Sequence, residues 1–210
     1  MFDDDYDISQ GTNYNIPNQE LAIDDFNKAI EINPNAESYI KRAYSKIAQN
    51  LSDKRKRDEI SSVISHLCEG VDGDISKAIA IDPSYSEAYY LQAHCNDRRA
   101  VADADSLLKD YSKAIELNPK NIHAYYSRAL VKKYQLKDES GALEDLNKAI
   151  EIAVSNPYSF ERRAVFKEYG NDNRGAIEDY EQAIKLYQDR GHNHHIDVIK
   201  SKIRGIKSDL

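Results

Sequence analysis

The sequence predicts an all-α solenoid in which antiparallel helix pairs recur about four and a half times. One observation is a ten-residue phrase, Asp110-Tyr-Ser-Lys-Ala-Ile-Glu-Leu-Asn-Pro119, that returns with small changes along the chain. Another is its spacing, because the alanine at the fifth position of the phrase recurs after 36, 35 and 34 residues between Ala78 and Ala183. A short aromatic phrase alternates with it. Recurrence at a period of this size is typical of stacked helical repeats.

The ten-residue phrase predicts the second helix of each repeat. Its alanines and isoleucines lie at helical spacing, and the Asn-Pro or Asp-Pro that ends three of the copies stops the helix. The adjacent acids Glu144-Asp145 and Glu178-Asp179 recur in register, and we expect them to form the solvated face of this helix. The copies span Asp25–Pro34, Asp74–Pro83, Asp110–Pro119, Asp145–Ile152 and Asp179–Leu186.

The aromatic phrase predicts the first helix of each repeat. An aromatic residue and an alanine four residues later lie on one helix face. The large ring fills the gap to a neighbouring helix, while the alanine lets the paired helix approach closely. The copies are Tyr39-Ile-Lys-Arg-Ala43, Tyr89-Tyr-Leu-Gln-Ala93, Tyr125-Tyr-Ser-Arg-Ala129 and Phe160-Glu-Arg-Arg-Ala164.

With these residues, the segment 19–190 resembles the tetratricopeptide-repeat proteins. The Tyr125, Arg128 and Ala129 pattern is similar to the Tyr-x-x-Arg-Ala/Gly subtype common in bacterial members. Two departures from the family pattern are Leu107, where an alanine is expected, and Val154-Ser-Asn, which lacks the stop proline. The resemblance implies a right-handed superhelical solenoid. The copy that fits best carries Phe160, Ala164, Gly170, Ala176, Tyr180 and Ala183.

Both ends of the solenoid have their own character. Residues 1–18 are acidic and turn-rich, and we expect a mobile tail; the alternative is that their aromatic residues cover an exposed repeat end. Residues 191–210 predict a C-terminal capping helix, whose basic side could alternatively lie on an anionic surface. Its apolar face carries Ile196, Ile199, Ile203 and Ile206.

One interval breaks the period, because Ala29 and Ala78 are 49 residues apart. The extra residues continue a helical apolar stripe that includes Ile60, Val63, Ile64, Leu67, Cys68 and Val71. We therefore expect an elongated second helix over about 52–70 that projects from the solenoid, with Gly70 and Gly73 as places where it kinks or splits.

Composition excludes several classes of function. The net charge of −7 disfavours general nucleic-acid binding, and no apolar run is long enough to span a membrane. The acidic N-terminus lacks the features of a signal peptide, which favours a cytoplasmic location. We accordingly expect Cys68 and Cys95 to be reduced thiols.

The sequence contains no recognisable catalytic motif, so we expect a protein that is not an enzyme and needs no cofactor. Its glycines form no phosphate-binding loop. The histidine run His192-Asn-His-His195 is the one metal-like cluster, and a short run of this kind beside Gly191 is more often a solvated turn. We therefore expect no metal site.

What remains is a binding function. In the family, the first helices of the repeats line a concave groove that holds a peptide or a helix of a partner protein, and the resemblance assigns residues to that groove. The alternative for the tyrosines is that they pack between helices. The assigned residues are Tyr90, His94, Arg98, His123, Tyr126, Lys133, Tyr158 and Arg162.

A second hypothesis is a self-assembling structural protein, for example a homodimer. The first helix, over about residues 18–33, is a second helix whose repeat lacks a first helix, which would expose Leu21 and Phe26. The expected elongated helix would add a further apolar patch. By contrast, the residues with which some family members clamp a chaperone's C-terminal carboxylate are missing at the matching positions Ile40, Tyr44, Leu91, His123 and Ser127.

Overall fold

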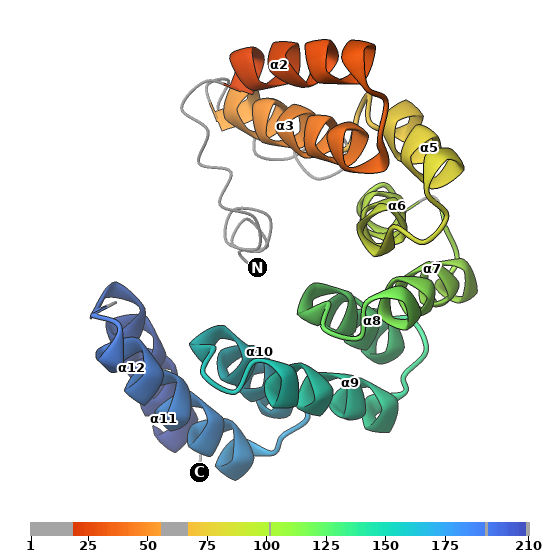
Figure 1. Cartoon of the computed structure of the whole chain (residues 1–210). Coiled ribbons are helices and arrows are strands. Elements are labelled where there is room, and N and C mark those ends of the chain that lie inside the picture. The colour runs from red at the N-terminus through yellow and green to blue at the C-terminus, as the bar shows by residue number, and fades with distance from the viewer. Residues whose placement is uncertain (1–18, 56–66, 101, 192, 209–210) are drawn as a thin grey trace. The chain divides into compact units, whose positions relative to one another are not determined.

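Helices and the turns between them make up the part of the chain that the computed structural model describes, which is residues 19–55, 67–100, 102–191 and 193–208 (Figure 1). No strand occurs within these ranges. The chain divides after Val131 into two compact units, which are described separately. The predicted all-α class is confirmed.

The first unit contains the helices that belong to the first three repeats. Successive helices from α2 to α7 pack against one another, and Ala36, Ala43, Ala78, Ala88 and Ala114 lie buried at the close approaches. The helices are α2 (Gln19–Ile32), α3 (Ala36–Arg55), α5 (Asp72–Ile81), α6 (Ser86–Arg98), α7 (Ala104–Leu117) and most of α8 (Ile122–Tyr134).

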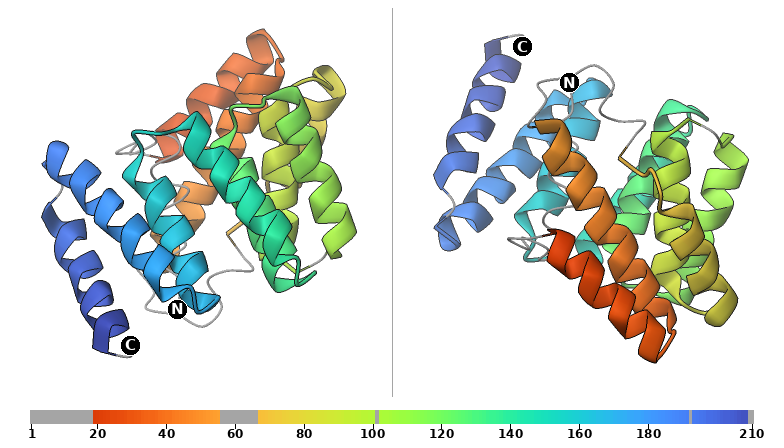
Figure 2. Two further views of the ribbon diagram at one scale, coloured as in Figure 1. Left: turned by 90° about the horizontal axis from the view of Figure 1, so that it is seen from below. Right: turned by 90° about the horizontal axis from the view of Figure 1, so that it is seen from above.

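The second unit begins in the last turn of α8 and ends with α12. Figures 1 and 2 show α11 and α12 side by side, and the isoleucine face of α12 packs into one core with Tyr180 and Tyr187. A last helix is therefore present, and its isoleucine face is buried, as the sequence predicts. The helices are α9 (Glu139–Ile152), α10 (Pro157–Tyr169), α11 (Asn173–Asp189) and α12 (Asn193–Ser208).

The alternation of helices follows the two sequence phrases. We call the helices with the aromatic phrase (α3, α6, α8 and α10) A helices, and those with the ten-residue phrase (α2, α5, α7, α9 and α11) B helices. The small residue of every A phrase is fully buried, as predicted, because a larger side chain would push the paired helices apart. These residues are Ala43, Ala93, Ala129 and Ala164, each 0 % exposed.

The B helices α9 and α11 have the same N-terminal cap. The carboxylates of Asp138 and Asp172 accept hydrogen bonds from the backbone N–H groups of Gly141 and Gly175, which caps α9 and α11. A Cβ atom at Gly141 or Gly175 would lie 2.2 or 2.3 Å from the capping carboxylate, so a larger residue would require the aspartate side chain to shift.

The prediction of an elongated B helix is wrong for the residues that the structure describes. The B helix α5 has 10 residues and begins at Asp72, while the A helix before it, α3, is the long one at 20 residues. Gly70 adopts φ +74°, a left-handed conformation that ends any helix entering it, and residues 67–70 form turns. Leu67 and Val71 are buried, and Val71 packs in one core with side chains of α3, α5 and α6. The remainder of the predicted stripe, Ile60, Val63 and Ile64, lies outside the described residues.

The expectation of two reduced thiols is also wrong, because Cys68 and Cys95 form a disulfide. The turns at 67–70 bring the chain back against α6, so the two Cα atoms lie 5.5 Å apart although 27 residues separate them in sequence. Both cysteines are buried. The cysteines therefore give no support to a reducing compartment.

The paired acids do not form a solvated face, which corrects another expectation. Glu144 and Glu178 are exposed, but Asp145 and Asp179 are buried. The Asp179 carboxylate accepts two hydrogen bonds from the Arg163 guanidinium, at 2.8 and 2.7 Å, and forms an ion pair with Lys167 at 2.9 Å. One acid of each pair thus faces solvent while its neighbour faces the A helix.

The same arrangement recurs along the chain. In the first unit, Asp74 accepts from Arg42 and from Lys46, four residues later on α3. In the second unit, Lys132 lies 2.9 Å from Asp145. We call a buried B-helix aspartate with its A-helix cations a clasp.

The arginine of each clasp also reaches the preceding B helix. Arg163 donates to the side-chain oxygen of Asn147 at 2.6 Å, and Arg42 donates to that of Asn27 at 2.7 Å. Arg128 makes the corresponding contact with Ser112 at 3.0 Å. One guanidinium therefore ties each of these A helices to the helix before it, and in two repeats it joins three consecutive helices.

The repeat formed by α6 and α7 lacks the clasp. Gln92 stands where the other A helices carry arginine, and its amide donates to Asp110 at 2.9 Å. Burial raises the pKa of Asp110, against the smaller lowering effects of Gln92 and of Lys109. The ionised carboxylate is therefore less well stabilised here than beside a guanidinium.

Removing the clasp aspartate Asp179 should lower the free energy of unfolding of the second unit more than removing its exposed neighbour Glu178. Asp179→Ala leaves Arg163 and Lys167 partly buried without their carboxylate, and we expect a loss of about 3 kcal/mol in the free energy of unfolding. Glu178→Ala, the matched control, should change it by less than about 0.5 kcal/mol. Urea unfolding checks both values, and equal effects would contradict the clasp.

Breaking the disulfide should destabilise the first unit by about 3 kcal/mol, because the bond closes a loop of 27 residues in the unfolded chain. The measurement is urea unfolding with and without a thiol reductant. The control is Cys68→Ala with Cys95→Ala, whose unfolding midpoint should not respond to reductant. Two free thiols in the native, unreduced protein would disprove the bond.

Supplying the missing cation should stabilise the α6–α7 repeat. Gln92→Arg is expected to add about 1 kcal/mol near pH 7, an amount discounted for partial exposure. The pKa of Asp110 is raised in the folded state, so the folded state binds more protons than the unfolded state as the pH falls. Ionised Asp110 therefore lowers the free energy of unfolding near pH 7, and this loss disappears when the carboxyl is protonated.

The advantage of Gln92→Arg should therefore shrink as the pH is lowered toward about 4, the ordinary aspartate range. Thermal unfolding across this pH range measures it. The uncharged control Gln92→Met should show no gain at pH 7, and a gain as large as that of arginine would exclude the electrostatic explanation.

Candidate partner-binding surface

The A helices repeat their packing residues but not the residue that follows the aromatic. The clasp and alanine positions recur, whereas Ile40, Tyr90, Tyr126 and Glu161 occupy the position directly after the aromatic residue. Packing accounts for the residues that recur. Of the residues that differ, Ile40, Tyr90 and Tyr126 are buried and Glu161 is half-buried.

In the first unit, Tyr90 lies within a group of rings. Its ring centroid is 5.7 Å from that of His94, with the planes stacked, and 6.2 Å from those of Tyr111 and His123. Tyr90 and His94 are each 6 % exposed, and Tyr126 is 3 % exposed. These three side chains therefore pack between helices and do not line an open groove.

Two other predicted residues of the first unit remain accessible. His123 and Arg98 are half-buried, His123 beside Tyr90 and Arg98 in the last turn of α6. A partner could contact them without displacing a helix.

In the second unit, Lys133 is held within aromatic rings. Its Nζ donates to the carbonyl oxygen of Phe166 at 3.0 Å and lies 3.7 Å from the centroid of the Phe166 ring. The centroids of Tyr169 and Tyr134 are 5.4 and 5.6 Å away. Burial lowers the pKa of Lys133, and the residue is 8 % exposed. Lys133 thus joins the ends of α8 and α10.

The other two predicted residues of this unit lie together at the start of α10. The Arg162 guanidinium lies 4.5 Å from the centroid of the Tyr158 ring, which is a cation–π contact, and both side chains are half-buried. The ring holds the guanidinium in place while leaving part of it accessible.

Exposed apolar side chains surround the end of α8 and the end of α10. Tyr134, Leu136 and Tyr169 are 44, 43 and 58 % exposed, and two of them contribute rings to the Lys133 site. We call these three residues the aromatic rim. Sequence reasoning missed Tyr169, for which the available signal was a tyrosine just before Gly170 at the end of an A helix.

The described residues form neither a metal site nor a membrane-spanning helix. Across the described ranges, no group of histidine, cysteine and acidic residues is placed to hold a metal ion. His195 stacks on Tyr187 at 4.8 Å, while the side chains of His192 and His194 lie outside the described residues. None of the described helices is both long enough and apolar enough to cross a membrane.

Comparison with known proteins shows the fold. No family model and no curated protein matches the chain. Among solved structures, the thermophilic tetratricopeptide-repeat protein TTC0263 of Thermus thermophilus aligns with a TM-score of 0.65 at 15 % identity, covering 92 % of each chain.

Two further solved structures show the same likeness. The MamA protein aligns with a TM-score of 0.55 at 18 % identity, over 83 % of this chain and 91 % of that one. The TPR2AB domain of yeast Sti1, solved in complex with pHSP90, aligns with a TM-score of 0.52 at 18 % identity, over 90 and 92 % of the two chains. The chain therefore has the tetratricopeptide-repeat fold.

Proposed function

We propose that this chain is a non-enzymatic scaffold that binds a peptide or helix of a partner protein on its A helices. The observation that supports this most directly is the division of labour within each repeat. Recurring alanines and clasps hold the helices, while Arg98, His123 and Arg162 on the same A helices stay partly exposed.

The aromatic rim is the part of this surface best suited to an apolar anchor of the partner. Tyr134 and Tyr169 offer large areas with few rotatable bonds, and Lys133 fixes their rings by cation–π contacts. A surface that is rigid before binding loses little conformational entropy when a partner is bound. The rim is therefore preorganised for an extended peptide or an amphipathic helix.

The residues assigned from the sequence divide into two roles in this proposal. The half-buried His123, Arg98 and Arg162 supply hydrogen bonds and charge to the partner, and Tyr158, whose hydroxyl is buried, holds the Arg162 guanidinium over its ring. The buried Tyr90, His94, Tyr126 and Lys133 set the spacing and rigidity of the surface, so they act on binding through the helices that carry them.

The fold is compatible with peptide binding, since the Sti1 domain was solved in complex with pHSP90. The partner of this chain should nevertheless differ in chemistry from a peptide held by a carboxylate clamp. Ile40, Leu91 and Ser127 stand where such a clamp needs basic or amide side chains. We propose a protein partner recognised through apolar and aromatic contacts, and neither a nucleic acid nor a membrane.

The proposal is tested by placing a photoreactive phenylalanine analogue at Tyr169 in the full chain and identifying its cross-linked partner in the native host. The affinity of that partner is then measured for Tyr134→Ala with Tyr169→Ala. We expect a loss of at least about tenfold, because truncating an aromatic hot spot costs about 2 kcal/mol. The unfolding temperature is recorded for each variant.

Val154 provides the matched control, because it is 66 % exposed and apolar but lies beyond the end of α9. The analogue at Val154 should not capture the same partner, and Val154→Ala should leave the affinity unchanged. Equal capture at both sites, or an affinity that does not depend on the rim, would reject the proposed surface.

A further inference from the structure

The last helix, α12, has the register of an A helix. It follows the B helix α11, and its buried Ile196, Ile199 and Ile203 have the spacing of the buried Ala88, Leu91 and Cys95 of the A helix α6; Ile196 and Ile203 then match the buried Ser159 and Phe166 of α10. This alignment places Lys200 and Arg204 of α12 at the positions of the clasp cations of α10. It also places the small Ser201 at the position of the alanine that recurs in the A phrases. The corresponding residues of α10 are Arg163, Lys167 and Ala164.

In α10 these three positions receive a B helix, whereas in α12 they are open. Ala164 is 0 % exposed under α11, and Arg163 and Lys167 bind Asp179. Ser201 and the two cations of α12 are exposed, and no described residues cover them as a B helix.

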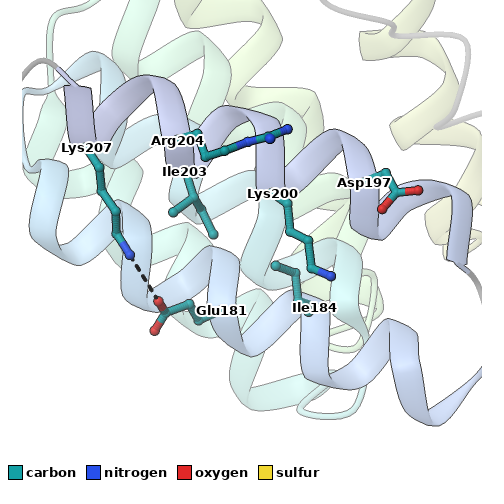
Figure 3. Close-up of a pocket in the computed structure, with 7 residues that line it drawn as sticks. All are labelled: Glu181, Ile184, Asp197, Lys200, Ile203, Arg204 and Lys207. Atoms are coloured by element: carbon teal, nitrogen blue, oxygen red, sulfur yellow. Dashed lines mark ion pairs between the residues drawn. The ribbon is translucent and has the colours of Figure 1, made fainter.

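Beside these cations, a hollow of about 560 Å³ runs between α11 and α12 (Figure 3). Lys200 points across it to Ile184 of α11, and Lys207 forms an ion pair with Glu181. In α10, the clasp arginine Arg163 contacts Asn147 of the preceding B helix and Asp179 of the B helix in its own repeat. The corresponding side of α12 is therefore the side on which a B helix of the same repeat would lie. The lining residues are Glu181, Ile184, Asp197, Lys200, Ile203, Arg204 and Lys207.

The first described helix, α2, is the complementary half. It carries the B phrase, and Asp25 occupies the position of the clasp aspartate. The Asp25 side chain is 79 % exposed, against 6 % for that of Asp179, and its contact with Lys28 at 3.8 Å is a solvated pair. Ala22 and Ala29 are also partly exposed, whereas their counterparts Ala176 and Ala183 are fully buried.

The two ends therefore match in charge and in shape. One offers a cation pair beside a small residue, and the other offers a carboxylate between two alanines. We propose that α12 of one copy and α2 of a second copy together form a complete repeat, in which Asp25 takes its place between Lys200 and Arg204.

This contact would join copies head to tail. Its two surfaces differ, so each bound copy leaves one α2 and one α12 open for the next, and assembly continues until the concentration limits it. Leu21, which is 60 % exposed on α2, adds apolar area to the contact. The inference goes beyond the proposed partner binding, because it uses the exposed faces of α2 and α12 and leaves the aromatic rim open.

Charge reversal tests the contact on the full-length protein. Sedimentation velocity and light scattering over a concentration series should show the wild-type mass rising above 23.9 kDa. Asp25→Arg, and separately Lys200→Glu with Arg204→Glu, should each weaken self-association at least tenfold, because each places like charges at the junction. All of these residues are exposed, so the fold should be unaffected, which circular dichroism verifies.

The decisive sample is an equimolar mixture of the two charge-reversed proteins. The reversed α2 of one meets the reversed α12 of the other, and the remaining pair of ends is native, so both junctions are again complementary. We expect the mixture to regain the wild-type dependence of mass on concentration. Loss of folding or a general change in net charge cannot produce this recovery.

Glu116→Arg is the matched control, because Glu116 is an exposed carboxylate in an i,i+3 pair with Lys113, like Asp25 with Lys28. It should associate as the wild type does. The inference is overturned if the wild type stays at 23.9 kDa at every concentration, if the reversed proteins associate normally, or if their mixture shows no recovery.

Discussion

The clasp between a buried aspartate and the cations of an A helix is the interaction on which the arrangement of the repeats depends. A carboxylate buried without a partner would favour unfolding, so Asp179 and Asp74 require the guanidinium and ammonium groups that meet them. The guanidinium in turn has donors left for the preceding helix, which Asn147 and Asn27 accept. The alanines allow close approach, and the clasp selects the register at which the helices meet.

The repeat without a clasp shows what replaces it. Gln92 gives Asp110 a neutral donor only, and α6 is instead attached to the helix before it by other means. Cys95 of α6 is bonded to Cys68, and Arg99 donates two hydrogen bonds of 2.7 Å to Asp72 at the start of α5. The irregular spacing before α5 and the missing clasp in α6 are therefore neighbouring features. Where the repeat departs from its pattern, a covalent bond and a peripheral ion pair hold the helix.

The sequence was sufficient for the period, the helix types and the buried alanines, because these follow from local spacing. It was insufficient wherever burial depends on another helix. Asp179 and Glu178 are adjacent acids that the sequence does not distinguish, and Asp179 is the buried one because it meets Arg163 in the fold. Likewise, the apolar stripe before α5 continued without interruption, but the left-handed conformation of Gly70 ends it. For Tyr90, helical spacing could not distinguish a groove from a ring cluster between helices, and the structure shows the cluster.

Partner binding on the A helices and self-assembly through α2 and α12 are compatible in one chain, because they use different surfaces. A head-to-tail junction built from α12 and α2 does not use Tyr134, Leu136 or Tyr169, so every added copy would bring another aromatic rim. A partner with several matching segments would then bind with an effective concentration set by the spacing of the repeats, and modest single contacts would add up to tight binding. Because the junction relies on Asp25, Lys200 and Arg204 near solvent, salt would weaken the assembly more than it weakens the buried clasps within each copy.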